Sequence, residues 1–109
     1  MSDTSPSSVD LDPGTVLVVT AAITGSLVLL DFTTKLTTYL FGVGSDWEVT
    51  ASMAAGPSVT AAFKTRNGVP PRLATLEQRS NITDSLTGLV LRALNDLGVG
   101  FSGILTETP

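Results

Sequence analysis

The sequence predicts an α+β fold, in which an antiparallel sheet of hairpins is followed by a C-terminal amphipathic helix. Apolar and polar residues alternate over residues 47–53 and again over 59–64, which is the period of a strand with one buried face. Over residues 82–97 the apolar residues recur instead at helical spacing. Strands that precede a helix in chain order are typical of α+β proteins, and no internal repeat is found.

Chain length and composition indicate one folded domain with a polar N-terminal arm. A chain of 109 residues, 42% of them hydrophobic, can bury a core of ordinary size. We assign residues 13–109 to a single α+β domain. Residues 1–12 have the polar composition of a flexible segment, and we expect a flexible arm or one that is exchanged between subunits.

Residues 13–30 carry no charged side chain, which raises the question of a membrane span. The run is shorter than the roughly 20 apolar residues of a transmembrane helix, and Thr, Gly and Ser interrupt it. A secretory signal is not expected, because residues 1–12 contain three Asp and no Lys or Arg. We therefore predict no membrane contact, and a hairpin whose strands, residues 16–23 and 26–32, meet at Thr24-Gly25.

The following segment, residues 32–40, fits two different periods. A strand is indicated because every second position would share one face: Phe32, Thr34, Leu36, Thr38 and Leu40. A helix would bring together Phe32, Leu36, Tyr39 and Leu40. Four Thr residues favour the strand, since β-branched side chains lose rotamer freedom in helices.

Residues 47–53 and 59–64 are predicted to form a second hairpin, with the turn at Ala55-Gly56-Pro57. Residues 72–79 fit a short strand or a helical turn, because Leu73 and Leu76 are three positions apart, and the strand is preferred.

The helix over residues 82–97 has plausible signals at both ends. Asn81 or Thr83 can cap its start, with Asp84 favourable near the N-terminal dipole, and Gly98 is a natural stop. The tail, residues 99–106, fits a last strand or a short helical turn packed on a partner.

The low charge content predicts association. Only 15% of the residues are charged, against about 25% in an average soluble protein, and a surface poor in charge is poorly protected against self-association. We expect a homo-oligomer, a dimer or larger. The apolar face of the helix is the predicted subunit interface: Leu86, Leu89, Val90, Ala93, Leu94 and Leu97.

Enzymatic chemistry finds little support. The chain has no His and no Cys, so an activated nucleophile would need Lys35 or Lys64 as its base. Asp46 and Glu48 share one face of a predicted strand, but a lone carboxylate pair is a weak signature of acid–base catalysis. We expect no enzyme, no metal site and no cofactor.

Charge is distributed unevenly along the chain. Residues 64–79 hold four basic residues and Glu77, a net charge of +3, whereas residues 1–12 carry −3. An acidic arm that crosses the basic edge of the next subunit would explain both segments. The alternative is a phosphate-binding or RNA-facing surface that comprises Thr50, Ser52, Thr60, Lys64 and Arg66. The overall acidity, with ten acidic against six basic residues, argues against strong non-specific binding of nucleic acid.

The order of these elements resembles that of the coat proteins of single-stranded RNA bacteriophages. The strand pair WEVTASMAAGPSVTAAFKTR and the helix NITDSLTGLVLRALNDLG carry the likeness, together with the predicted N-terminal hairpin. The resemblance implies a virion structural protein that self-assembles into a shell in the host cytoplasm, and it would place Lys64 and Arg66 toward RNA.

Two other functions remain open. A decoration, neck or tail-completion protein of a tailed phage would share the low charge, the arm and the mixed fold. A small ligand-binding α+β domain is the third hypothesis, and a stable monomer in solution would favour it.

Overall fold

The computed structural model of the chain describes residues 15–43, 47–65 and 76–107. Within these ranges the chain forms four strands and two helices: β1 (Thr15–Thr24), α1 (Leu29–Phe41), β2 (Trp47–Ala54), β3 (Ser58–Thr65), α2 (Leu76–Asp96) and β4 (Gly100–Glu107). The predicted arm, residues 1–12, lies outside the described residues.

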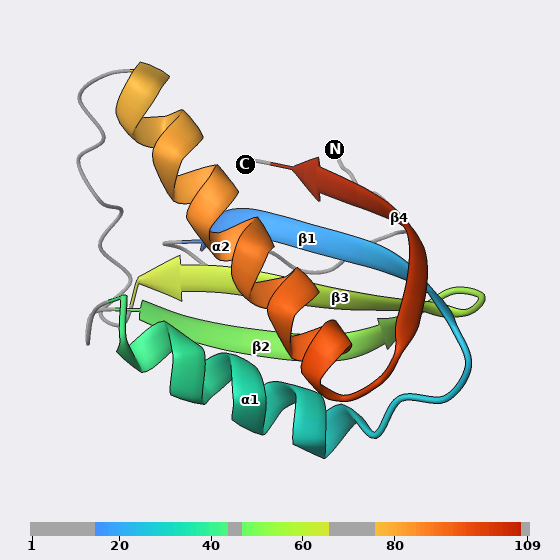
Figure 1. The fold of residues 1–109 in the computed structure, drawn as a ribbon. Helices are drawn as coiled ribbons and strands as arrows, with labels where there is room; N and C mark the ends of the chain where they lie inside the picture. Colours follow the sequence, from blue (N-terminus) through green and yellow to red (C-terminus); the bar gives the residue numbers. More distant parts are fainter. Residues whose placement is uncertain (1–14, 44–46, 66–75, 108–109) are drawn as a thin grey trace, which may run out of the picture.

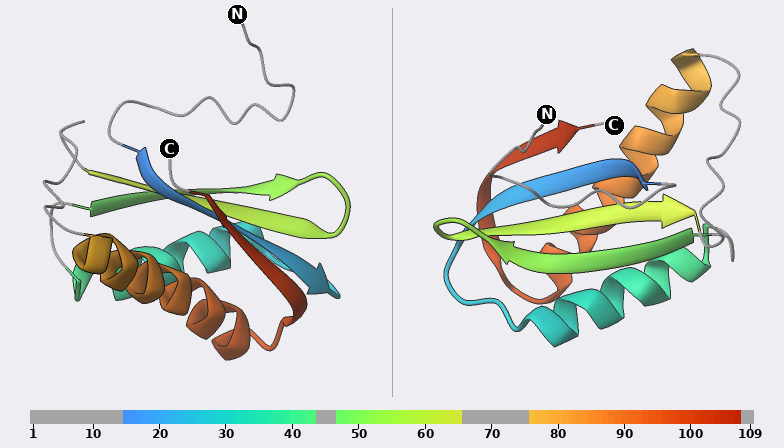
Figure 2. Two further views of the ribbon diagram at one scale, coloured as in Figure 1. Left: turned by 90° about the horizontal axis from the view of Figure 1, so that it is seen from above. Right: turned by 180° about the vertical axis from the view of Figure 1, so that it is seen from behind.

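The strands form one antiparallel sheet in the order β2-β3-β1-β4, and both helices pack on the same face of it (Figures 1 and 2). The α+β class and the antiparallel sheet are confirmed. The helix is not the last element, because β4 follows it and pairs with β1.

Each helix connects two parallel strands that are separated by a third. The chain runs from β1 through α1 to β2, with β3 between the two strands, and from β3 through α2 to β4, with β1 between them. This is the split βαβ topology of ferredoxin-like folds. Among the described residues, neither helix is both long and apolar enough to span a membrane.

The N-terminal hairpin and the strand over residues 32–40 were wrong predictions. The chain does turn after Thr24, where Gly25 has a φ of +111°, but it then leaves the sheet and forms α1. Phe32, Leu36 and Leu40 lie one helical turn apart and are almost completely buried against the sheet. Burial of this stripe outweighs the low helix propensity of the Thr residues, which amounts to well under about 1 kcal/mol each.

The β2–β3 hairpin is confirmed, with strand bounds within one residue of those predicted. Gly56 has a φ of +68°, a conformation that Gly adopts without strain, and the Ser58 amide donates to its carbonyl. The register pairs Val49 with Phe63 and Ala51 with Ala61, so these side chains face the helices together.

Helix α2 begins six residues earlier than predicted. Residues 76–79 are helical, which corrects the preferred strand over 72–79, while 72–75 lie outside the described residues. Asn81, Thr83 and Asp84 therefore lie inside the helix and do not cap its start. Leu, Glu, Gln and Arg at positions 76–79 are good helix formers, which explains why the helix extends toward its N-terminus.

Gly98 ends α2 as predicted. Its φ is +72°, and its amide donates to the carbonyl of Asn95 at 3.0 Å. The amide of Val99 donates to the carbonyl of Leu94 at 2.9 Å, and both side chains are buried. These are the two hydrogen bonds and the apolar contact of a Schellman motif, which directs the chain into β4.

The core lies between the sheet and the two helices. From α2 it receives Leu86, Val90, Ala93 and Leu94, each no more than 1% exposed, and Leu89 and Leu97 pack against it partly buried. The apolar face of α2 therefore belongs to the interior of the single chain. The four buried residues are not available to a second subunit, so Leu89 and Leu97 are the members of the predicted interface that stay accessible.

Two glycines of this region predict opposite effects of one substitution. Gly98→Ala should lower the free energy of unfolding by about 1 kcal/mol, because a side chain disfavours the left-handed conformation. Gly88→Ala should instead raise it by up to about 1 kcal/mol, because Gly88 is helical and an added Cβ meets no atom within 4 Å. Urea unfolding followed by circular dichroism measures both. Equal effects of the two substitutions would contradict the assignment of Gly98 as the helix stop.

Candidate functional site

The sheet has an open face, on the side opposite the helices, which no other described element covers (Figure 2). Side chains alternate along strands, so residues that flank the core positions point to this face. The register places Thr50, Ser52, Thr60 and Lys64 there, as predicted from the sequence. Arg66, the fifth predicted residue, lies outside the described residues.

The centre of the open face is built of small side chains, of which Thr60 is only 5% exposed. Thr60 lies between Ser52 on β2 and Thr20 on β1, and the hydroxyls of Thr20 and Thr60 are hydrogen-bonded at 3.1 Å. Ala22 and Ala62 lie on the same face. Paired threonines stabilise neighbouring strands, and this row therefore has a structural role in the sheet.

The charges of the open face do not form a cationic surface. Lys64 lies opposite Glu48 of β2 in the register, and Glu107 of β4 lies opposite Val18. Binding of a polyanion requires an excess of cations that neutralise phosphates. Within the described part of the chain this face offers one lysine and two glutamates. The predicted carboxylate pair is untested, since Asp46 lies outside the described residues.

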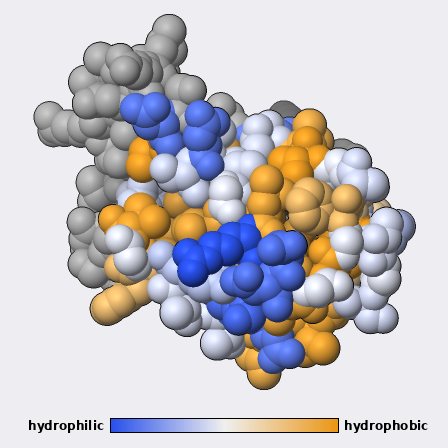
Figure 3. All heavy atoms as spheres, in the orientation of Figure 1, coloured by the Kyte–Doolittle hydropathy of each residue, from blue (hydrophilic) through white to orange (hydrophobic). Residues whose placement is uncertain are grey.

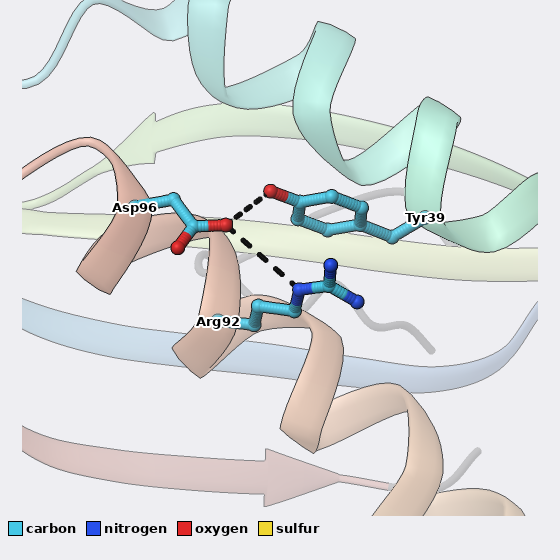
Figure 4. A network of polar contacts seen from close by, with 3 residues as sticks. All are labelled: Tyr39, Arg92 and Asp96. Atoms are coloured by element: carbon cyan, nitrogen blue, oxygen red, sulfur yellow. Dashed lines mark hydrogen bonds and ion pairs between the residues drawn. The ribbon is translucent and has the colours of Figure 1, made fainter.

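A polar cluster joins the two helices on the other side of the molecule (Figure 4). The hydroxyl of Tyr39, on α1, donates a hydrogen bond to Oδ2 of Asp96, on α2. Arg92 lies one turn before Asp96, with its Nε 3.8 Å from the same oxygen and its guanidinium 4.2 Å from the centre of the Tyr39 ring. The Nζ of Lys35 lies 6.0 Å from that ring centre.

The Tyr39–Arg92–Asp96 cluster links α1 to α2. Asp96 is in the last turn of α2, where the helix dipole disfavours a carboxylate, and the Tyr39 hydroxyl and Arg92 offset that effect. Its one signal in the sequence is weak, the i,i+4 spacing of Arg92 and Asp96. Among the described residues no three His, Cys, Asp or Glu side chains gather as metal ligands.

Large apolar side chains are exposed at several separate places. In the described residues they lie at both ends of α1 and on the two edge strands of the sheet: Val28, Leu30, Phe41, Val43, Met53, Phe101 and Leu105. Figure 3 shows hydrophobic surface on both sides of a hydrophilic area over the helices. Sequence patterns did not single out these residues, because the exposure of the ends of α1 and of β4 depends on a topology that was not predicted.

The polar cluster predicts a measurable coupling between the helices. Tyr39→Phe should lower the free energy of unfolding by about 1 kcal/mol, because the hydrogen bond to Asp96 is lost. Tyr39→Leu should lower it by about a further 0.5–1 kcal/mol, because the ring that faces Arg92 is also removed. A double-mutant cycle of Tyr39→Phe with Asp96→Ala isolates the contact. A coupling energy near zero would show that the two side chains do not interact in solution.

Searches of known protein families, of curated proteins and of solved structures find no significant match to this chain. The split βαβ topology is shared by proteins of many unrelated functions, so the fold alone does not identify one. Function is therefore inferred from the surfaces of the described residues.

Proposed function

We propose that this chain is a structural protein that works by assembling with copies of itself, and that it is a component of a virion. The observation that carries the proposal is the exposure of large apolar side chains at both sheet edges and at both ends of α1. Two of these places combine neighbouring exposed side chains, Val28 with Leu30 and Phe41 with Val43, and contiguous apolar surface of this kind marks protein–protein contacts. A charge content of only 15% supports the same conclusion.

The distribution of these side chains favours an assembly subunit over a ligand-binding domain. A small-molecule site needs apolar and polar groups that converge on one concave surface. Here Leu30 and Phe41 lie at opposite ends of α1, and Leu105 lies on β4, which is separated from α1 in the fold. A subunit of a ring or shell needs contacts on more than one side, which this arrangement supplies.

Two kinds of virion component, an RNA-enclosing coat and a decoration, neck or tail-completion protein, fit this chain to different degrees. The strand pair and the late helix, which carry the resemblance to RNA phage coats, are present in the fold, whereas α1 stands where a hairpin was expected. The open face also lacks an excess of cations among its described residues. These two observations favour the second candidate, a decoration, neck or tail-completion protein, over an RNA-enclosing coat.

Assembly is tested on the purified wild-type chain. Light scattering coupled to size-exclusion chromatography should detect a defined oligomer at tens of micromolar. A stable monomer of 11.3 kDa would contradict the proposal and would favour the ligand-binding hypothesis.

The absorbance of the assembled particles separates the two virion functions. A coat that encloses RNA should show excess absorbance at 260 nm, and Lys64→Ala with Arg66→Ala should remove the RNA while the particles remain. We expect particles free of nucleic acid, as a decoration or neck protein requires. Packaged RNA that this double variant loses would establish the coat function instead.

A further inference from the structure

Among the described residues, no strand and no helix runs along the outer edge of β4. In the described part of the chain β4 pairs with β1 alone, so the backbone N–H and C=O groups on its other side face outward. Edge strands are commonly protected by Lys, by Pro or by a covering element, because an open edge can pair with another chain. β4 contains neither Lys nor Pro, and its one charge is Glu107.

The opposite edge of the sheet, β2, is better covered. Helix α1 runs along β2 on the helix side of the sheet, as the front and top views show (Figures 1 and 2). β4 has no helix along its outer side in these views. Both outer strands of the sheet have an open edge and contact a helix on the covered face, β2 contacting α1 and β4 contacting α2, but only α1 runs along its edge strand (Figure 1).

β4 has a regular segment that is long enough to pair. A bulge at Ser102 interrupts its ladder with β1, whereas Gly103, Leu105 and Glu107 pair in sequence with Ala22, Thr20 and Val18. These three residues of β4 point to the open face. Leu105, at the middle of the segment, is 61% exposed.

We propose that β4 pairs antiparallel with β4 of a second copy of this chain, about a two-fold axis that passes through Leu105. In this register Leu105 meets Leu105 of the second copy, Ile104 lies opposite Thr106, and Gly103 lies opposite Glu107. The two side chains of each pair point to the same face of the sheet, as antiparallel pairing requires. The four strands of each copy then form one continuous sheet across the dimer.

Charge and apolar surface both suit a second copy as the partner. The two Glu107 side chains would be four positions apart along the strands, about 14 Å, which exceeds the Debye length of about 8 Å at physiological salt. No like charges face each other, and the exposed Leu105 is covered by its own counterpart. The isologous contact closes as a dimer. It also leaves the ends of α1 free for a second contact.

This pairing deepens the proposed function and rests on it, because it names the first contact of the assembly. The test replaces Leu105 by Lys, which places two like charges at the two-fold axis. Leu105→Lys should raise the dimer dissociation constant by about 100-fold or more in sedimentation equilibrium, a loss that corresponds to about 2.8 kcal/mol. The monomer should stay folded by circular dichroism, since Leu105 is largely exposed.

Leu30→Lys is the matched control, because it makes the same change at a 74% exposed position on α1. It should leave the dimer intact. Dimers that survive Leu105→Lys would overturn the β4 pairing but leave self-assembly standing. A wild-type chain that is monomeric would overturn both.

Cysteine substitution locates the contact independently, because the chain has no Cys. Opposed residues of antiparallel strands have Cβ atoms about 4.5–5.5 Å apart, within reach of a disulfide after small shifts. Diamide, which takes up the two hydrogens, should convert Leu105→Cys into a covalent dimer. Met53→Cys, 49% exposed on β2, should stay monomeric under denaturing electrophoresis. Cross-linking through Met53→Cys and not through Leu105→Cys would assign the contact to the other edge.

Discussion

The fold depends on β1, the strand that holds the sheet together from its interior. It pairs with β3 on one side and with β4 on the other, and both partners are distant in sequence. Leu17, Val19 and Ala21 are completely buried beneath the helices. A charged residue at Val19 or Ala21 would disturb both ladders and the core at once, because each of these residues is paired on both sides and buried.

The two helices are fixed to this sheet by different means. α1 is held by Phe32, Leu36 and Leu40, which form a narrow buried stripe, and its start at Val28 has no side-chain cap. α2 ends in a Schellman motif at Gly98, so its C-terminus and the start of β4 are defined by backbone geometry. Tyr39 and Asp96 connect the exposed sides of the helices. The core determines where α1 lies, and the polar cluster then fixes its contact with α2.

Local patterns predicted those elements in which the spacing of the apolar residues agrees with the turn or helix-end residues that flank them. The β2–β3 hairpin has clean alternation and a Gly-Pro turn, and α2 has a long apolar stripe that ends at Gly98. α1 was missed because its Thr residues and its uncapped start resemble a strand, and only burial against a sheet already formed makes the helix favourable. The open-face positions of Thr50, Ser52, Thr60 and Lys64 followed from alternation alone. The polar cluster and the exposed edge of β4 depend on which distant segments meet, which a single sequence does not reveal.

The chain order of the sheet has a consequence during synthesis. Thr20 lies opposite Leu105, 85 residues later in the chain (105 − 20 = 85), so one side of β1 has no partner until β4 has left the ribosome. At a translation rate of about 5–20 residues per second, that interval lasts about 4–17 s. An apolar, uncharged strand is exposed to aggregation throughout this time. Faster synthesis shortens this interval, and the sheet is complete only when its last described strand has been made.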